Sequence, residues 1–444
     1  LPNRRLDRGW SWLAGGNRFA LHAHLLESLK PTRNIDRPDS DSSLDAMTNS
    51  GRSPRIWYGV QGEGRGHASR AASLSAALRS SGCSVRIFAG GEALGIVGTD
   101  PGMVEIPSLR FHRNGRQISL VKTVKANLTH APELFGFAGA VSARLDREAR
   151  TEKPDLVISD FEPFLARWAS KNRVPWMSID HQHALTDTIL PTLGPRLDLE
   201  GRILSMFVEW LAPSRDRIVS SFHHFSPRAG TRARFVGCFL RPEVLDATAT
   251  DNGHVCVYLK DPELLGRVAP LAAARPDVRF EIWTDSVISL PSNAICRSPH
   301  PVDFLHSLAS CHWLLTTAGN QLLGEALRLG KPVLAIPAPG QTEQIYNALA
   351  LVDSGCGDWR KPDELSTESV ARFLGSHPRF VHACQARNEH PHQVDGTTAA
   401  TEMVMERLRS AWQDQYRLGP SAVVAGPVGS HHSGARNVTV GWSP

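Results

Sequence analysis

From residue 56 onward, short apolar runs alternate with longer stretches in which apolar and polar residues share the turns of a helix. Short apolar runs bounded by turn residues are typical of buried strands, and apolar residues three and four apart are typical of helices. The first repeat is a strand at 56–60, a glycine-rich turn and a helix with one apolar face. Gly82 ends that helix, and a second strand follows at 85–89. This β-α-β order predicts a parallel sheet.

The same alternation continues along the chain and restarts after a polar segment that begins at Arg241-Pro242. Further strands are expected at 156–159, 176–179, 255–259, 278–284, 313–316 and 332–336. Further helices are expected at 163–171, 262–274, 301–309, 321–329 and 343–353, and residues 105–150 are expected to be mostly helical. We therefore predict an α/β protein with two Rossmann-like domains, whose parallel sheets face each other across a cleft.

The domain boundaries follow from changes in composition. We expect an N-terminal α/β domain over 53–240, a linker over 241–253 and a C-terminal α/β domain with closing helices over 254–418. Residues 1–52 are a polar leader without periodicity, which we expect to be disordered or misassigned, with Met47 as the natural start. Residues 419–444 are expected to form a disordered tail.

Charge and composition exclude several classes of protein. The chain of 444 residues has a formal net charge of +5 but no dense block of Lys and Arg, so nucleic acid is not expected as a partner. No stretch approaches the roughly 20 apolar residues of a membrane-spanning helix. The seven cysteines lack CxxC spacing and lie mostly in apolar segments, as expected in a reducing compartment. We expect a cytoplasmic protein.

The glycine-rich turn Gly62-Glu63-Gly64-Arg65-Gly66-His67 follows the first strand and opens the first helix. Glycines allow close approach of the backbone, and the amides at a helix start favour an anionic or oxygen-rich ligand. The turn lacks the last glycine of the dinucleotide-binding pattern, and the chain contains no P-loop. We favour a functional loop over a simple tight turn.

His67 is the candidate general base. Asp160 ends another strand of the same predicted sheet, so both residues are expected at one rim, where the carboxylate would orient the imidazole. Asp160 as a helix cap is an equally open interpretation. His181 and His183 also close a strand at this rim; we favour a polar cleft lining over a metal site because no third ligand is evident.

The richest segment of the second half is TTAGNQLLGEALRLGKPVLAIPAPGQTEQ. A strand ends at Thr316, the chain turns at Ala318-Gly319, and a helix begins whose free amides, including those of Asn320 and Gln321, form a potential phosphate site. Glu325 lies six residues beyond Gly319 on the same helix, where a carboxylate would reach a ribose diol. Glu343 and Gln344 open the next helix with groups suited to sugar hydroxyls.

These motifs resemble the nucleotide-sugar glycosyltransferases of the GT-B fold. GEGRGHASR, PDLVISDFEP, IDHQH and the long segment above occur in the family's order over about residues 55–358, and they look closest to family 28, with its lipid I N-acetylglucosaminyltransferases and diacylglycerol glycosyltransferases.

The resemblance implies an acceptor side at Gly62, Gly64, Gly66 and His67, and a donor side at Gly319, Glu325, Glu343 and Gln344. It also places the loop that meets the base near His300. One departure is the sequence YLKDPE, where lipid I enzymes have a Gly-Gly-Ser-like loop; Lys260 there either replaces phosphate contacts or lies on the surface.

We therefore expect an inverting hexosyltransferase that moves a hexose or N-acetylhexosamine from a UDP-sugar to a hydroxyl acceptor, lipid or glycan. No metal or cofactor is expected, since the only Asp-x-Asp lies in the leader. The alternatives are a UDP-N-acetylglucosamine 2-epimerase-like enzyme and a non-catalytic sugar-nucleotide-binding protein. Residues 201–212 would place Ile203, Phe207, Trp210 and Leu211 on one helix face; we favour packing within the first domain over a peripheral membrane contact.

Overall fold

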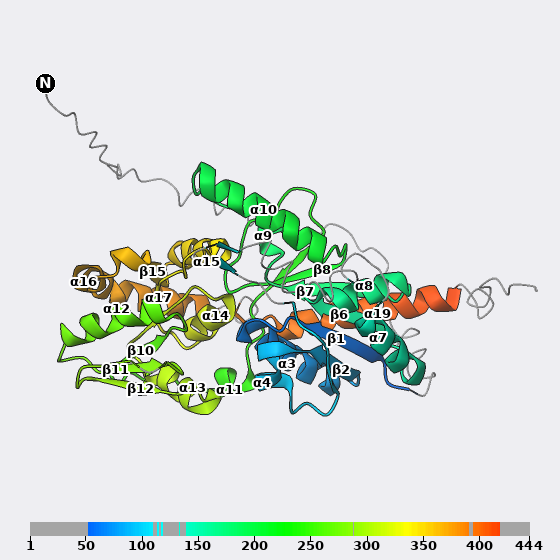
Figure 1. Ribbon diagram of the computed structural model, residues 1–444, viewed down its shortest axis with the longest axis horizontal. Coiled ribbons are helices and arrows are strands. Elements are labelled where there is room, and N and C mark those ends of the chain that lie inside the picture. Colours follow the sequence, from blue (N-terminus) through cyan, green and yellow to red (C-terminus); the bar gives the residue numbers. More distant parts are fainter. Residues whose placement is uncertain are drawn as a thin grey trace, which may run out of the picture. The chain divides into compact units, whose positions relative to one another are not determined.

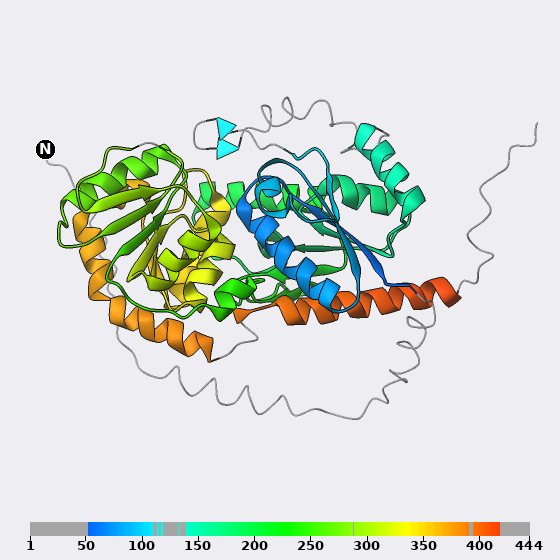
Figure 2. The ribbon, with the colours of Figure 1, turned by 90° about the horizontal axis from the view of Figure 1, so that it is seen from below.

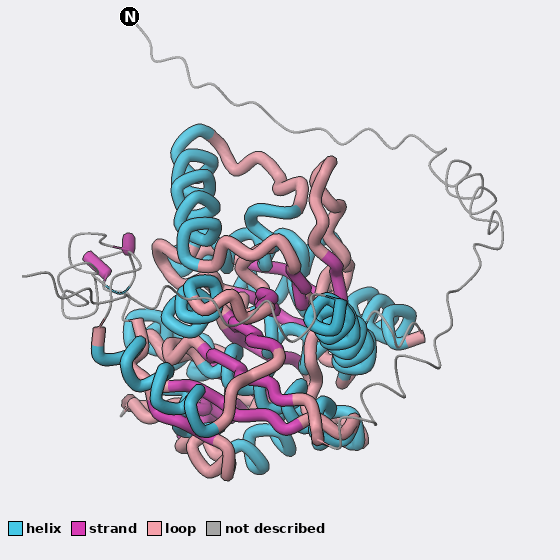
Figure 3. Tube along the Cα trace, turned by 90° about the vertical axis from the view of Figure 1, so that its right-hand side faces the viewer, coloured by secondary structure: helices cyan, strands magenta, loops and turns pink. Residues whose placement is uncertain are grey.

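The computed structural model describes residues 52–109, 113–114, 117–118, 133, 139–286, 288–389 and 394–417. Within this part of the chain, a seven-stranded and a six-stranded parallel sheet form the two cores, and helices pack around the strands (Figures 1 and 3). The predicted fold class, two Rossmann-like α/β sheets, is confirmed.

The first sheet has the strand order β3-β2-β1-β6-β7-β8-β9. Its strands are β1 (Arg55–Val60), β2 (Ser84–Ala89), β3 (Met103–Glu105), β6 (Leu156–Asp160), β7 (Trp176–Asp180), β8 (Arg217–Ser220) and β9 (Arg234–Val236). In β6 every residue is buried, and in β1 every residue except the first is. Burial on both faces is typical of the central strands of a parallel sheet and explains why these runs are continuously apolar.

The helices of this half connect successive strands. They are α3 (Arg65–Ser80), α4 (Leu94–Val97), α7 (Ala140–Thr151), α8 (Pro163–Lys171), α9 (Ala184–Asp187) and α10 (Pro195–Leu211), with a short 3₁₀ turn η1 (Gly91–Ala93). The strands β4 (Arg113–Asn114) and β5 (Gln117–Ile118) form a separate antiparallel pair. Most of the remaining predicted helical region between 105 and 138 lies outside the described residues.

The second sheet has the order β12-β11-β10-β13-β14-β15. Its strands are β10 (Val255–Tyr258), β11 (Phe280–Trp283), β12 (Ala294–Arg297), β13 (Trp313–Thr316), β14 (Val333–Ala335) and β15 (Gly357–Trp359). Its helices are α11 (Pro242–Asp246), α12 (Pro262–Ala273), α13 (Pro301–Ser310), α14 (Asn320–Arg328), α15 (Thr342–Asp353), α16 (Thr367–Gly375) and α17 (His377–Asn388), with the 3₁₀ turn η2 (Pro362–Glu364). The strands and helices predicted from 255 to 353 are all present, within a few residues at their ends.

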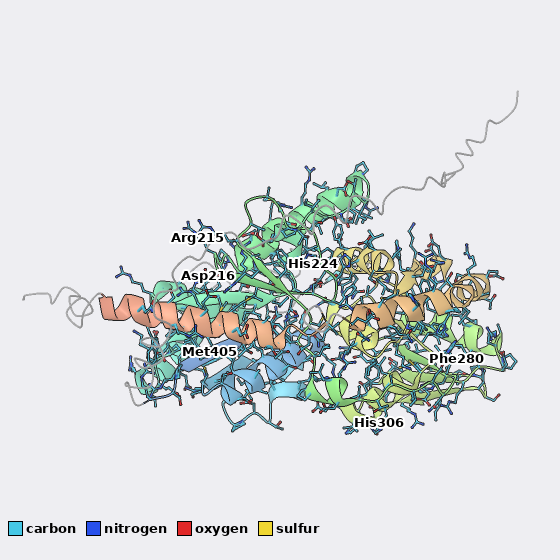
Figure 4. The ribbon with its side chains drawn as sticks, turned by 180° about the vertical axis from the view of Figure 1, so that it is seen from behind. Arg215, Asp216, His224, Phe280, His306 and Met405 are labelled. Atoms are coloured by element: carbon cyan, nitrogen blue, oxygen red, sulfur yellow. The ribbon has the colours of Figure 1, made fainter. Side chains whose placement is uncertain are left out.

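The last described helix, α19 (Thr397–Arg417), returns to the first sheet. It lies alongside α3 and β9 (Figure 2). Met405, labelled in Figure 4, accepts a contact from the Cys83 thiol at 3.5 Å between the sulfur atoms, and Arg407 pairs with Asp216 at 2.8 Å. The chain therefore crosses back to the first sheet near residue 395, and the predicted domain boundaries remain a prediction.

Direct hydrogen bonds join the two sheets at their carboxyl edges. His181 Nε2 and Asn347 Oδ1 are 2.9 Å apart, and the backbone N–H of Phe222 donates to Asn320 Oδ1 at 3.0 Å. The side chains of all four residues are buried. No helix in the described ranges is both long and apolar enough to cross a bilayer.

Candidate active site

A cleft of about 1250 Å³ lies where the carboxyl ends of strands from both sheets meet. Its wall includes Gln61 after β1, His181 after β7, Tyr258 at the end of β10 and Thr317 after β13. Ligands of open α/β sheets bind beyond the carboxyl ends of the strands. The position and size of this cleft therefore make it the candidate active site.

Four helices begin at the cleft, and none of them has a side-chain cap. Their N-cap residues are Gly64 for α3, His300 for α13, Gly319 for α14 and Gln341 for α15. The first amides of an uncapped helix have no partner within the helix, and the helix dipole adds a partial positive charge there. Four such starts around one cleft suit a multiply charged anion.

His67 and Asp160 form the predicted pair. His67 Nδ1 lies 2.7 Å from Asp160 Oδ1, which leaves Nε2 as the imidazole nitrogen able to take a proton from a ligand. The Asp160 side chain is fully buried, whereas that of His67 is 12% exposed and lines the cleft. The cap alternative for Asp160 is wrong, because Glu162 caps α8 by accepting from the N–H groups of Phe164 and Leu165.

A third member of this group, Arg70, was not anticipated. Its Nε and Nη2 donate to the two oxygens of Asp160 at 2.7 and 2.6 Å, and Nη2 lies 3.2 Å from His67 Nδ1. Burial alone would lower the pKa of the Arg70 guanidinium, but the adjacent Asp160 carboxylate outweighs it and the pKa is raised. The carboxylate that orients His67 is therefore already neutralised by a buried cation.

The glycines of the loop have different roles. Gly64 has φ 88°, a left-handed conformation that favours glycine, and it lines the cleft with Gly66. Gly62 does not line the cleft; a Cβ there would lie 2.3 Å from Ser108 Oγ and 2.4 Å from the Gly90 carbonyl oxygen. The Gly62 backbone therefore packs closely against Ser108 and Gly90. The expectation that Gly62 contacts a ligand is wrong.

The start of α14 is open as predicted, but two side chains there are engaged. Asn320 accepts from Phe222 and donates to the Ser220 carbonyl, and Gln321 donates to the Phe239 carbonyl at 2.9 Å. These residues line the cleft, so their backbone amides, and not their side-chain amides, are available to a ligand. Ala318 is fully buried and its carbonyl accepts from Asn347; it shapes the turn without lining the cleft.

Glu325 lines the cleft and is paired with a residue that the sequence pattern assigned to the linker. Arg241 Nε and Nη2 lie 3.2 and 3.0 Å from Glu325 Oε1 and Oε2. Gln321 Nε2 donates to the same Oε1 at 3.3 Å. The carboxylate expected to meet a ribose is therefore held from two sides.

The remaining predicted donor residues also lie on the cleft wall. Glu343 accepts a long hydrogen bond from Gln182 at 3.5 Å, and Gln344 Oε1 accepts from the backbone N–H of Ala338 at 2.8 Å, which fixes the loop after β14. His300 is largely exposed at the start of α13. Lys260 pairs with Glu92 on the facing wall of the cleft at 2.9 Å, and both side chains are exposed to solvent.

His183 is not a cleft residue, in contrast to the prediction. Its Nδ1 lies 2.7 Å from Asp180 Oδ2, and its Nε2 lies 3.1 Å from the Ala212 carbonyl. Its side chain is 1% exposed, because the turn into α9 directs it into the first sheet's packing. His181, the other histidine of the motif, lines the cleft instead.

Apolar side chains form part of the cleft wall. Phe161, Leu185, Leu204 and Phe207 line the same cleft as His67, the last two from α10. Phe161 has φ 54°, a strained value for a bulky residue, and its ring lies 6.4 Å from the His67 ring, nearly parallel to it. The region beside the candidate base therefore suits an apolar group.

Comparisons with known proteins show the family. A sequence profile of the family described as glycosyl transferase family 1 matches residues 54–378. An uncharacterized glycosyltransferase of Methanosarcina acetivorans is 22% identical over 350 residues, which cover 72% of this chain and 90% of that protein. The chain belongs to glycosyl transferase family 1.

Solved glycosyltransferases share the fold. The glycotransferase of kitacinnamycin superimposes with a TM-score of 0.58 at 15% identity, over 80% of this chain and 99% of the other. The calicheamicin glycosyltransferase CalG4 gives 0.57 at 18% identity, over 80% and 98%. The GT-B expectation is confirmed at the level of fold and family, and the narrower placement in family 28 remains a prediction.

Two residues of this glycosyltransferase were missed from sequence. Arg70 follows His67 by three positions on α3, so it shares a helix face with the candidate base, and that spacing was a usable signal. Arg241 carried no such signal, because its partner lies 84 residues away. Among the described residues, no three His, Cys, Asp or Glu side chains gather as metal ligands would.

Proposed function

We propose that this glycosyltransferase moves a hexose or N-acetylhexosamine from a UDP-sugar to a hydroxyl of an apolar acceptor, with inversion and without a metal ion. The observation that carries the proposal is the ring of four uncapped helix starts around a cleft that also contains a His–Asp pair. The helix starts supply the positive potential that a leaving diphosphate needs, which is the role that a cation plays in other transferases.

The chemistry assigned to His67 is removal of the acceptor proton. Nδ1–H donates to Asp160, so the lone pair on Nε2 takes the proton from the acceptor hydroxyl as its oxygen bonds to the anomeric carbon. The bond from that carbon to the diphosphate breaks at the same time, and UDP leaves with the electron pair. Attack from the face opposite the leaving group inverts the anomeric centre.

The donor is held by the second half of the chain. The backbone amides of Asn320 and Gln321 face the diphosphate, whereas the amide of Gly319 already donates to the Thr317 carbonyl at 3.0 Å. Glu325 accepts from the ribose, and Glu343 and Gln344 meet the sugar hydroxyls. Lys260 adds a positive charge at the rim when it leaves Glu92.

The acceptor is assigned from the apolar wall. Phe161 after β6 has its ring 6.4 Å from the His67 ring, and Leu204 and Phe207 of α10 add apolar surface to the same cleft. Of the face predicted on this helix, Leu211 is fully buried, Phe207 lines the cleft, and Ile203 and Trp210 are 48% and 38% exposed. This arrangement favours a lipid-like or other largely apolar alcohol over a glycan; the peripheral membrane contact remains a prediction.

Activity is tested by release of nucleoside diphosphate from a panel of sugar nucleotides in the presence of long-chain alcohols. His67→Ala should lower turnover at least about 100-fold, the usual contribution of a general base, and should leave UDP affinity nearly unchanged. His312→Ala is the matched control, since His312 pairs with Asp251 outside the cleft wall. Full activity in His67→Ala would contradict the base assignment.

The product separates this proposal from its alternatives. Transfer gives a glycosylated alcohol; an epimerase gives a changed sugar nucleotide without an acceptor product, and a binding protein gives neither. For the acceptor, Phe207→Ser should raise KM for a long-chain alcohol severalfold. Met206→Ser, at the preceding position and 73% exposed, should leave KM unchanged. Equal effects of the two substitutions would refute the apolar wall.

A further inference from the structure

Glu325 offers less to a ligand than a carboxylate normally does. Its side chain is 6% exposed, and three N–H donors already point at it: Arg241 Nε at 3.2 Å, Arg241 Nη2 at 3.0 Å and Gln321 Nε2 at 3.3 Å. An ionised carboxylate has about four lone-pair sites for hydrogen bonds. About one site therefore remains for a group entering from the cleft.

Arg241 is held in this position by the fold. It caps the start of α11 in an extended conformation directly before Pro242, and its side chain is 22% exposed. Burial lowers the pKa of its guanidinium, but Glu325 opposes this and the pKa is raised, so the cation persists. The planar fork of arginine matches a carboxylate at two points, which fixes the orientation of Glu325.

The neighbouring acceptor on α14, Gln321 Oε1, adds no site for a ligand. Gln321 Oε1 is enclosed and meets no donor among the described residues, but its amide is fixed by the bond of Nε2 to the Phe239 carbonyl. A ribose presents two hydroxyl donors, at the 2′ and 3′ carbons, whereas a 2′-deoxyribose presents one. With one free site, Glu325 binds a single hydroxyl.

We propose that Arg241, by occupying Glu325, makes the donor site indifferent to the 2′-hydroxyl, so that ribonucleoside and 2′-deoxyribonucleoside diphosphate sugars are bound alike. This inference rests on the proposed function, in which Glu325 meets the sugar of the nucleotide. Arg241 is then the residue that sets nucleotide specificity, and it acts through the number of acceptor sites that it leaves on Glu325.

The test is isothermal titration of the full chain with UDP and with 2′-deoxy-UDP, which differ only in the hydroxyl concerned. The wild-type Kd values should agree within about threefold. Arg241→Met frees two acceptor sites and should favour UDP by about tenfold or more, since a hydrogen bond to a charged group gives at least that factor. Arg241→Lys keeps the charge but pairs with Glu325 at one point, so its preference for UDP should lie between those of the wild type and Arg241→Met. It replaces Arg241→Met in the test if the methionine variant does not fold.

The outcomes separate the inference from the function beneath it. A wild-type preference of tenfold or more for UDP overturns the inference and leaves the donor site standing. If the wild type binds UDP and 2′-deoxy-UDP equally and both Arg241 variants do so too, Arg241 is not the cause of the equal binding. That result also overturns the inference. If neither nucleotide binds below 1 mM, and the matched adenine and guanine pairs fail as well, the proposed function itself is refuted.

Discussion

Removal of the Arg70 guanidinium would leave the Asp160 carboxylate as a fully buried charge, with His67 as its one remaining side-chain donor among the described residues. Arg70→Met is the cleanest change, because methionine retains much of the aliphatic length of arginine and removes its cation. Arg70 supplies two of the three side-chain hydrogen bonds that the carboxylate receives.

The magnitude follows from those contacts. Hydrogen bonds to a charged group contribute about 1.5–3 kcal/mol each, and loss of one partner of a buried ion pair costs about 3–5 kcal/mol. We expect Arg70→Met to lower local stability by about 3 kcal/mol, the lower end of that range, because His67 still donates to the carboxylate. Adding Asp160→Asn to the Arg70→Met variant removes the buried negative charge, and the new amide oxygen can still accept the hydrogen bond from His67.

The assay is native-state hydrogen exchange with mass spectrometry on peptides from β1 and α3, residues 55–80, which report local opening free energies. The double variant Arg70→Met/Asp160→Asn should recover about 1.5 kcal/mol or more of the loss in Arg70→Met. A loss below 1 kcal/mol in the single variant, or simple addition of the two single effects in the double variant, would refute the reasoning.

Two further predictions concern stability. Burial raises the pKa of the Glu162 carboxyl to about 7 despite two N–H donors that oppose it, so the native state binds more protons than the unfolded state between about pH 4.5 and pH 7. The free energy of unfolding should fall as pH rises through that window, and Glu162→Gln should flatten this slope in urea titrations; identical slopes in both proteins would contradict the assignment. Gly62→Ala should destabilise the protein by about 2 kcal/mol or more, because its Cβ meets Ser108. Gly66→Ala should not, because the nearest atom lies 3.6 Å from its Cβ. Thermal melts in which Gly66→Ala is the less stable variant would contradict the described packing of the loop.

Much of the fold is readable from the sequence because the central strands of a parallel sheet are continuous apolar runs. The strands at β1, β6, β10 and β13 carry that signal and were all predicted. β8 and β9 were missed: they have four and three residues, each begins with an arginine, and β9 has no fully buried residue. β9 is the edge strand and β8 is its neighbour. Such short strands depend on the strands beside them more than on their own pattern.

The site was predictable where a strand end fixed it. Asp160 ends β6, and His67 follows the turn after β1, so their meeting at 2.7 Å follows from the pairing of these neighbouring strands. His183 shows the limit of the rule, since a residue three positions beyond a strand can turn into the core, as it does beside Asp180. The Arg241–Glu325 pair could not be predicted, because its partners lie 84 residues apart and no local sequence pattern shows how the chain brings them together.

The central claim is that a nucleoside diphosphate binds at the start of α14. Gly319 has φ −78° and ψ 124°, a backbone open to any residue, and no atom lies within 4 Å of a Cβ added there. Gly319→Asp would place a capping carboxylate on the amides of Gln321 and Leu322, which should retain or slightly raise stability while filling the anion site with negative charge.

The decisive measurement is calorimetric titration of UDP into the wild type, Gly319→Asp and Gly319→Ala, each checked by thermal melting. We predict that Gly319→Asp binds UDP at least tenfold more weakly without loss of stability, and that Gly319→Ala stays within about threefold of the wild type. UDP affinity unchanged by the aspartate would contradict the claim.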